Sequence, residues 1–369
     1  MRSLASLLSS DARSQMALLG YPSSPFAVLS REAVVIGIAA LGGAAFALLG
    51  VPAAWLSGSM MLSAAVAFIR PLPLLRKSWF DATVLLSGTI IGSAATPESL
   101  ATAARYPASL AVLVIGVAAI MIAGGAYLRY VARWPWIDAL LASAPGALAT
   151  VLAVAQAKGA NIGRISVVQL FRLLVLVALL PSAMQMTGLH PAASMPPSMA
   201  VGAATMLLLL LCGFAVGLVF ERLGVAAPMM FGATFASALL HGTGLVEGNL
   251  PTEIQTAVLV LLGSTMGGRI AHIPRNELLG LFPLAIGGFF VSIGVAFAFA
   301  WPAARFAGVS YASAMTAFAP GGLEAMAMLA FAMGLDTLYV GSHHLVRFLM
   351  IGIAMPFIVA RMKGETPKP

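Results

Sequence analysis

The chain has 369 residues, of which 60% are hydrophobic and only 9% are charged, and its mean hydropathy is +0.99. Soluble domains carry roughly 25% charged residues, so this composition excludes a soluble enzyme, a fibrous protein and a disordered chain. It is typical of a helical membrane protein with several spans, in which the net charge of +8 lies mainly in loops. The single cysteine, Cys212, excludes a disulfide framework and a thiolate metal cluster.

Residues 1–30 lack a clear secretory signal and are expected to form a cytoplasmic tail. A first membrane repeat is expected at 31–187, a linker at 188–199, a second membrane repeat at 200–361 and a cytoplasmic tail at 362–369. Runs long enough to cross a hydrocarbon core of about 30 Å lie at about 33–50, 52–69, 79–95, 107–128, 161–187, 200–220, 225–243, 255–271, 279–302 and 336–360.

Two further apolar segments, 135–158 and 310–333, are interrupted in the middle. The first contains Pro145-Gly146 and the second contains Pro320-Gly321-Gly322. Proline removes a backbone donor and clashes with the preceding turn, while glycine adds conformational freedom. We therefore expect the helix to break at both places, which makes each segment a re-entrant or broken helix.

The two halves of the chain are similar to each other in sequence. Residues 144–181 align with 319–356 at an offset of 175, with 11 of 38 positions identical, and the matches include Pro145/Pro320. Farther towards the N-terminus, Gly92 recurs as Gly268 in a register shifted by one residue. The common spacing of proline, glycine and arginine predicts an internal duplication.

The distribution of Lys and Arg indicates whether the two repeats are parallel or inverted. If all twelve segments cross fully, the repeats are parallel, with 12 Lys and Arg inside and 6 outside. If the two interrupted segments return to their starting side, each half has five true spans and the repeats are inverted. Then 16 lie inside and only Arg105 and Arg305 lie outside. The positive-inside rule favours the inverted arrangement, with both termini on the cytoplasmic side of the cell inner membrane.

Arg172 and Arg347 each lie about 11 residues into a span, which at 1.5 Å per residue is roughly 16 Å deep. In the inverted arrangement both reach the middle of the membrane. An arginine there costs at least ~2.5 kcal/mol and usually marks a pathway or a charge pair. Direct binding of a ligand, capping of the carbonyls of a broken helix, and snorkelling towards the surface all remain open.

Three further polar residues accompany these arginines. Glu324 follows the second interruption, and Ala149 occupies the corresponding position in the first half. Glu324 is either a protonatable group, a partner of Arg347, or a first-turn residue stabilised by the helix dipole. Gln169 and His344 lie three residues before the arginines, on nearly the same helix face.

Other polar residues are less suited to bind a ligand. A metal site at His343-His344 is not favoured, because adjacent side chains point apart and no carboxylate or further histidine accompanies them. Asn161 and Asp336 are expected to cap helix starts.

Discontinuous helices at matching places in two halves are the best sequence pointer to a transporter's binding site. We therefore expect neither a catalytic residue nor a cofactor nor a metal, but a substrate site between the repeats. Its expected residues are Pro145, Gly146, Gln169, Arg172, Pro320, Gly321, Gly322, Glu324, His344 and Arg347.

These motifs resemble the AbrB-duplication family of polytopic membrane proteins, over about 33–361. The resemblance rests on Gly50-Val51-Pro52-Ala53-Ala54-Trp55-Leu56-Ser57-Gly58, on Pro320-Gly321-Gly322-Leu323, and on the Gln/His-x-x-Arg helices. The first half departs from the pattern by carrying Ala147 where the second glycine would be. The resemblance implies an integral membrane protein linked by name to regulation of gene expression, and some members are labelled as ammonia monooxygenases. It supplies no catalytic residues.

The sequence thus predicts an all-α integral membrane protein with two inverted repeats, each of about five spans and one interrupted helix. The expected function is secondary transport of a small, anionic solute, with Glu324 as a proton carrier. The alternative is a membrane-embedded regulator or sensor that acts indirectly on gene expression. A basic DNA-binding module is lacking, as is the His and carboxylate cluster of a copper or iron oxygenase, so direct nucleic-acid binding and monooxygenase activity are not expected. The expected partners are the lipid bilayer and the solute, and a homo-oligomer is left open.

Overall fold

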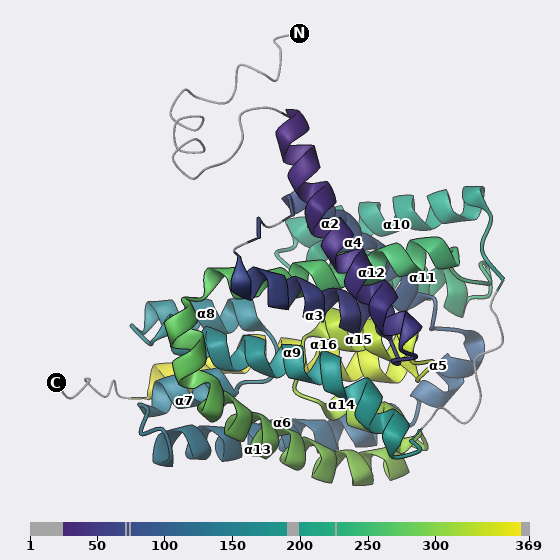
Figure 1. Cartoon of the computed structure of the whole chain (residues 1–369). Coiled ribbons are helices and arrows are strands. Elements are labelled where there is room, and N and C mark those ends of the chain that lie inside the picture. Colours follow the sequence, from purple (N-terminus) through teal and green to yellow (C-terminus); the bar gives the residue numbers. More distant parts are fainter. Residues whose placement is uncertain (1–24, 71, 74, 190–198, 226, 363–369) are drawn as a thin grey trace.

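The computed structural model describes residues 25–70, 72–73, 75–189, 199–225 and 227–362 (Figure 1). Over these residues the chain forms fifteen α-helices and one 3-10 helix. Most of the expected tails and linker lie outside the described residues, although helix α2 already begins at Pro25. The first half contains α2 (Pro25–Leu48), α3 (Ala54–Ile69), α4 (Lys77–Gly92), α5 (Pro97–Ala103), α6 (Tyr106–Tyr130), α7 (Trp136–Ser143), α8 (Leu148–Ala157) and α9 (Ile162–Met186).

The second half contains the same sequence of helices, apart from one short element. Its members are α10 (Ala203–Arg222), α11 (Pro228–Gly242), α12 (Thr252–Gly268), η2 (Arg269–His272), α13 (Arg275–Ala307), α14 (Tyr311–Phe318), α15 (Leu323–Ala332) and α16 (Thr337–Arg361). The caps predicted at Asn161 and Asp336 are confirmed. Their Oδ1 atoms accept hydrogen bonds from the backbone N–H groups of Arg164 and Tyr339, at 3.0 and 2.9 Å.

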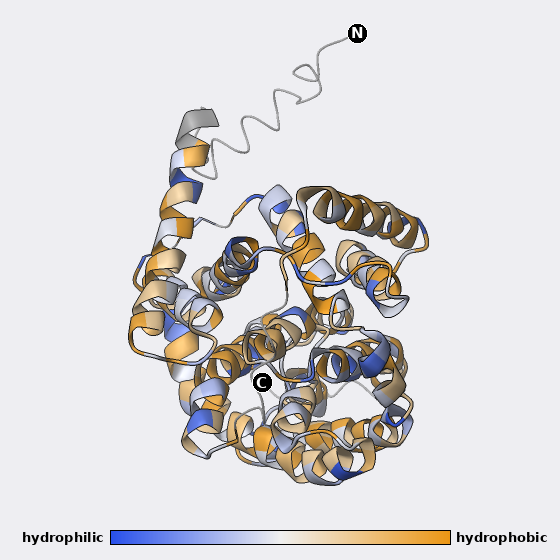
Figure 2. Cartoon of the chain, turned by 90° about the vertical axis from the view of Figure 1, so that its right-hand side faces the viewer, coloured by the Kyte–Doolittle hydropathy of each residue, from blue (hydrophilic) through white to orange (hydrophobic). Residues whose placement is uncertain are grey.

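Seven of the described helices are long and apolar enough to cross a membrane, namely α2, α6, α9, α10, α12 with η2, α13 and α16. Helices α3, α4 and α11 have only 16, 16 and 15 residues. They fall just below the usual lower limit of about 17 residues, so fewer runs become full-length helices than the sequence suggested. Large apolar side chains such as Leu48, Leu207 and Phe290 are exposed on the outer helices, and apolar residues cover the outside of the molecule (Figure 2). Such a surface fits contact with lipid.

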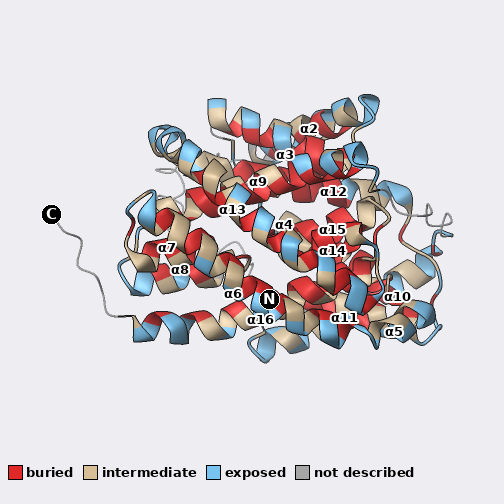
Figure 3. Ribbon diagram, turned by 90° about the horizontal axis from the view of Figure 1, so that it is seen from below, coloured by how far each residue is buried: buried red, intermediate tan, exposed pale blue. Residues whose placement is uncertain are grey.

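The helices pack as two groups. One group consists of α2, α3, α4, α10, α11 and α12, and the other consists of α6–α9 and α13–α16. In the second group α6 and α13 lie side by side along one edge of the molecule (Figure 1). The groups meet mainly where α3 packs on α9 and α4 packs on α15 and α16. Buried residues concentrate around α3, α9, α12, α14 and α15, in the interior of the molecule (Figure 3).

Two pairs of glycines allow close helix contacts within the first group. Gly88 and Gly92 of α4 face α11, where a methyl group on either glycine would lie 2.4 to 2.5 Å from a carbonyl oxygen. Gly263 and Gly267 of α12 face α3 in the same way, at 2.8 and 2.3 Å. Glycines four residues apart let two helix backbones approach, which is the main source of helix association in a membrane.

These contacts give a prediction for helix packing. Gly88→Ala and Gly267→Ala should each destabilise the protein by about 1–3 kcal/mol, because the new methyl group meets backbone that cannot move aside. The exposed Gly294 of α13 has no atom of another residue within 4 Å of such a methyl group. Gly294→Ala should therefore be neutral or stabilising. Apparent Tm in detergent measures the difference, and equal Tm values for all three variants would contradict it.

Candidate functional site

Both interrupted segments are broken helices, as the sequence predicted. Helix α7 ends at Ser143 and α8 begins at Leu148, while α14 ends at Phe318 and α15 begins at Leu323. We call residues 144–147 the first break and residues 319–322 the second break. Each break starts with an alanine that precedes proline, with ψ of 123° at Ala144 and 133° at Ala319. A residue before proline is forced out of the helical region, so the proline itself ends each helix.

The two breaks differ in backbone conformation. In the first break Gly146 and Ala147 both have positive φ, at 86° and 52°. Gly322, which corresponds to Ala147, is extended, with φ of −76° and ψ of 148°. The strained left-handed conformation therefore falls on the alanine, although only the second break carries the more permissive glycine.

The breaks approach each other closely. A methyl group on Gly146 would lie 3.7 Å from the carbonyl oxygen of Gly321 and 3.9 Å from Nε of Arg347. Arg347 therefore binds the second break and lies close to Gly146 of the first. Its side chain is only 1% exposed, which makes it the largest fully buried side chain among the described residues.

Both buried arginines cap the carboxyl end of a broken helix. Arg172 donates from Nη1 to the Ser143 carbonyl at 3.2 Å and from Nη2 to the Ala144 carbonyl at 2.8 Å. Arg347 donates from Nη1 to the Ala319 carbonyl at 2.9 Å and to the Phe318 carbonyl at 3.4 Å. Its Nη2 adds the Gly321 carbonyl at 3.3 Å. Each cation thus satisfies carbonyls that lost their helical donors, at the negative end of the helix dipole.

Gln169 and His344, one helical turn before the arginines, also donate to carbonyls of the broken helices. Gln169 donates from Nε2 to the Leu141 carbonyl at 2.8 Å, and His344 donates from Nε2 to the Thr316 carbonyl at 3.0 Å. Because Nε2 of His344 donates, its Nδ1 is free to accept the hydrogen bond from Nη2 of Arg347. The two polar side chains of the Gln/His-x-x-Arg motif therefore donate hydrogen bonds to the free carbonyls at the end of a broken helix.

Glu324 is not the partner of Arg347. It lies in the first turn of α15, it is partly buried, and it makes no hydrogen bond or ion pair with any described residue. Nε of Arg172 is also buried without a hydrogen-bond partner among the described residues. These two groups have binding capacity that the fold does not use.

The amino ends of α8 and α15 also face this region. Their N-cap residues, Ala147 and Gly322, make no side-chain capping hydrogen bond. An uncapped helix start presents backbone N–H groups and the positive end of the helix dipole, which attract anions. The two arginines and two helix starts therefore make the middle of the molecule electropositive.

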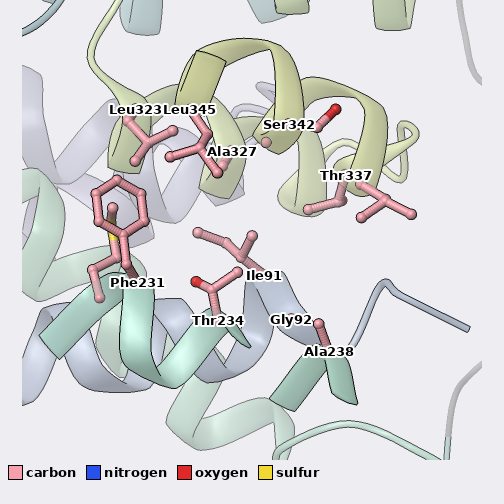
Figure 4. A pocket seen from close by; sticks show the side chains of 13 residues that line it. Ile91, Gly92, Phe231, Thr234, Ala238, Leu323, Ala327, Thr337, Ser342 and Leu345 are labelled. Atoms are coloured by element: carbon pink, nitrogen blue, oxygen red, sulfur yellow. The ribbon is translucent and has the colours of Figure 1, made fainter. Parts of the chain in front are cut away.

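A cavity of about 130 Å³ opens beside the second break, between α4, α11, α15 and α16 (Figure 4). Leu323 and Ala327 from α15 face Phe231 and Thr234 from α11 across it. The walls are mostly apolar, with hydroxyl groups from Thr234, Thr337 and Ser342. This cavity could not be predicted from the sequence, because its α4 and α11 walls carry ordinary membrane-helix residues.

The equivalence of Gln169 and His344 can be tested. His344→Gln should leave the free energy of unfolding nearly unchanged, because glutamine already performs this task in the first half. His344→Leu should destabilise the protein by about 1–3 kcal/mol, because it leaves the Thr316 carbonyl buried without a donor. Gln169→Leu is the matched variant and should behave alike. Thermal unfolding in detergent measures all three, and an equal loss for the Gln and Leu variants of His344 would refute the equivalence.

Comparison with known proteins identifies the family of the chain. The model of the family described as "Transition state regulatory protein AbrB" matches residues 67–363. The Bacillus subtilis (strain 168) protein YhjN is 24% identical over 369 aligned positions, which cover 91% of this chain and 95% of YhjN. The Escherichia coli (strain K12) protein described as "Putative regulator AbrB" is 26% identical over 326 positions, which cover 86% of this chain and 92% of the relative. The family model matches most of the chain, and seven described helices are long and apolar enough to cross a membrane. The chain is therefore a multi-pass membrane protein that belongs to the AbrB family.

Proposed function

We propose that the protein is a secondary transporter of a small anionic solute and not an enzyme. The observation that carries this proposal is the meeting of two broken helices in the interior, with a buried arginine capping each. Non-helical backbone is tolerated at membrane depth only where it is buried in protein or lines a cavity. Transporters use such breaks at matching places in two halves to bind their substrates.

The helix order supports an inverted repeat of five spans and one interrupted helix. Helices α3 and α12 pack through Gly263 and Gly267, and α11 and α4 pack through Gly88 and Gly92. Gly88 and Gly263, like Gly92 and Gly267, are 175 residues apart, the same offset at which residues 144–181 align with 319–356. The hydrogen bonds of Gln169 and Arg172 recur at His344 and Arg347 with the same offset. Matching contacts at matching spacing are what a duplicated fold requires.

The charges near the breaks favour an anion as the solute. Arg172, Arg347 and the starts of α8 and α15 contribute positive potential, and no described acid pairs with either arginine. A carboxylate could accept from Nε of Arg172 and from the free N–H groups of a helix start. Glu324, in the first turn of α15, would then bind the protonated or cationic part of a solute, or carry a proton itself.

The regulatory names of the family and of the Escherichia coli relative favour a second function, that of a membrane-embedded sensor acting indirectly on gene expression. A sensor would bind a ligand at the same breaks without moving it. We therefore propose transport as the primary function and keep sensing as the alternative that the flux experiment separates. The electropositive interior and the two breaks serve either function equally.

The proposed topology can be tested by labelling single cysteines in a Cys212→Ala background. Lys158, Arg222, Glu247 and Arg305 are all exposed. In an inner membrane with both termini cytoplasmic, cysteines at Lys158 and Arg222 should react only from the cytoplasm, and those at Glu247 and Arg305 only from outside. If the cysteines at positions 158 and 247 instead reacted from the opposite sides, the inverted arrangement would be wrong and twelve full spans would be supported.

The proposed function can be tested by counterflow in proteoliposomes loaded with lactate, succinate or glutamate. The wild-type protein should exchange at least one radiolabelled carboxylate. Arg347→Lys should lose at least ~10-fold in flux, because an ammonium cannot hold several carbonyls in a planar fork. Glu324→Gln should stay folded, since Glu324 supports no contact, and it is the control for stability. Saturable binding without exchange for every carboxylate would identify a sensor instead.

A further inference from the structure

The cavity of about 130 Å³ lies where the two groups of helices meet. Its α4 and α11 walls belong to one group, and its α15 and α16 walls belong to the other (Figure 4). Leu323, the first residue of α15, lies at one end of the cavity beside the second break. Thr337, the first residue of α16, lies at the opposite end. The cavity therefore extends from the second break towards the end of the molecule where α16 begins.

The walls of the cavity are apolar even where they carry hydroxyl groups. Thr337 donates from Oγ1 to the Leu335 carbonyl at 3.3 Å, and Ser342 donates from Oγ to the Tyr339 carbonyl at 2.9 Å. Both hydroxyl hydrogens are therefore used by nearby backbone, and only Thr234 adds a further hydroxyl to the wall. A buried water needs two to four polar partners, whereas a cavity with apolar walls stays dry and binds apolar molecules. The walls therefore favour an apolar group over water or an ion.

The volume of the cavity limits the size of the group that it can accept. Its volume of about 130 Å³ is close to the roughly 150 Å³ of an engineered apolar cavity that binds benzene. A phenyl ring is thus about the largest compact group that the cavity can hold, and a branched alkyl group of similar size also fits.

The enclosure of the cavity favours a small molecule over a lipid chain. Every residue that lines it is buried or half-buried, and Phe231 and Ala327 are among the buried ones. The lipid-exposed residues of α11, Phe235 and Leu239, do not belong to the lining. A lipid acyl chain needs a groove that is open to the bilayer along its length. A compact ligand held between the two helix groups fits this enclosed space better.

The corresponding place in the first half is filled by the protein itself. The alignment of the two halves pairs the small Ala327 with the larger Leu152. Here α3 packs directly on α9, and Ser57 donates from Oγ to the Val177 carbonyl at 2.8 Å. Since helix packing in the first half accommodates a leucine, packing alone does not require the alanine that leaves space in the second half.

We propose that this cavity binds the apolar part of the substrate, and that the substrate is a monocarboxylate carrying an aromatic ring or a branched alkyl group. This inference rests on the proposed function, which assigns the carboxylate to the electropositive breaks, and it names the class of solute. Leu323 belongs to both places, because it lines the cavity and begins the uncapped helix α15. A ligand can therefore place its carboxylate at the second break while its apolar group contacts Leu323, Ala327 and Phe231.

The same walls select against a second charge on the solute. A dicarboxylate such as succinate would place its other carboxylate against apolar side chains, and burying an unpaired charge is strongly unfavourable. The short chain of acetate would leave the cavity without an apolar contact. Selectivity for one carboxylate with one compact apolar group is therefore the property that the cavity adds to the breaks.

Equilibrium binding in nanodiscs tests this subsite without transport. Wild type should bind radiolabelled phenylacetate at least ~10-fold more tightly than acetate, because the buried ring gains apolar contact. Ala327→Leu should remove this preference by filling the cavity. Ala298→Leu is the matched control, because Ala298 is exposed on α13 and lies outside the cavity. Equal affinity of wild type for the two ligands, or an undiminished preference in Ala327→Leu, would overturn the proposal.

A second variant tests the subsite by enlarging it, in case Ala327→Leu does not fold. Leu345→Ala removes a wall side chain, so it should raise affinity for 3-phenylpropionate relative to phenylacetate by at least ~3-fold, the effect of burying one further CH₂ group. Leu349→Ala is its control, because Leu349 is exposed on the same helix and does not line the cavity. The same ratio of affinities in wild type and both variants would overturn the proposal.

Counterflow distinguishes failure of the subsite from failure of the proposed function. Wild-type proteoliposomes should exchange phenylacetate at least ~10-fold faster than succinate, whose second charge the cavity disfavours. If succinate exchanges while phenylacetate neither binds nor exchanges, the subsite is wrong and transport is supported. If phenylacetate binds with the expected preference but no carboxylate exchanges, transport is wrong and the cavity is the ligand site of a sensor.

Discussion

The capping of a broken helix by a buried guanidinium is the interaction on which the rest of the structure depends. Proline ends α7 and α14 in the interior and leaves carbonyls without donors. A buried arginine alone would also be unfavourable, because its charge has left water. When they lie together, the arginine supplies donors to the free carbonyls, and the carbonyls stabilise its buried charge. The proline and the arginine are 27 residues apart in both halves (172 − 145 and 347 − 320), and each arginine binds the carbonyl of the alanine that precedes the proline.

The parts of the structure that sequence could predict are those controlled by local chemistry. Pro145 and Pro320 act on the residue before them, so the breaks could be placed correctly, and Asn161 and Asp336 cap the helices that follow them. The sequence left capping of a broken helix as one of several roles for Arg347 and could not select it. Glu324 is close in sequence and opposite in charge, yet Arg347 binds backbone carbonyls. Every residue has a backbone carbonyl, so the sequence does not indicate which ones bind the arginine.

Other features depend on tertiary contact and were missed for that reason. The cavity is walled by Ile91, Phe231 and Thr234, whose identities are ordinary for membrane helices. Ser109 and Tyr339 lie 230 residues apart and become a pair only when α6 packs on α16.

The two halves share their framework and differ in their chemistry. Gln169 and His344 perform the same hydrogen bond to the framework, but only the histidine also accepts from its arginine through a second ring nitrogen. Strain falls on Ala147 in the first break, whereas the second break is relaxed and has the cavity at its side. The second half therefore has a relaxed break beside a cavity and the first half has a strained break, so the two breaks are not chemically equivalent.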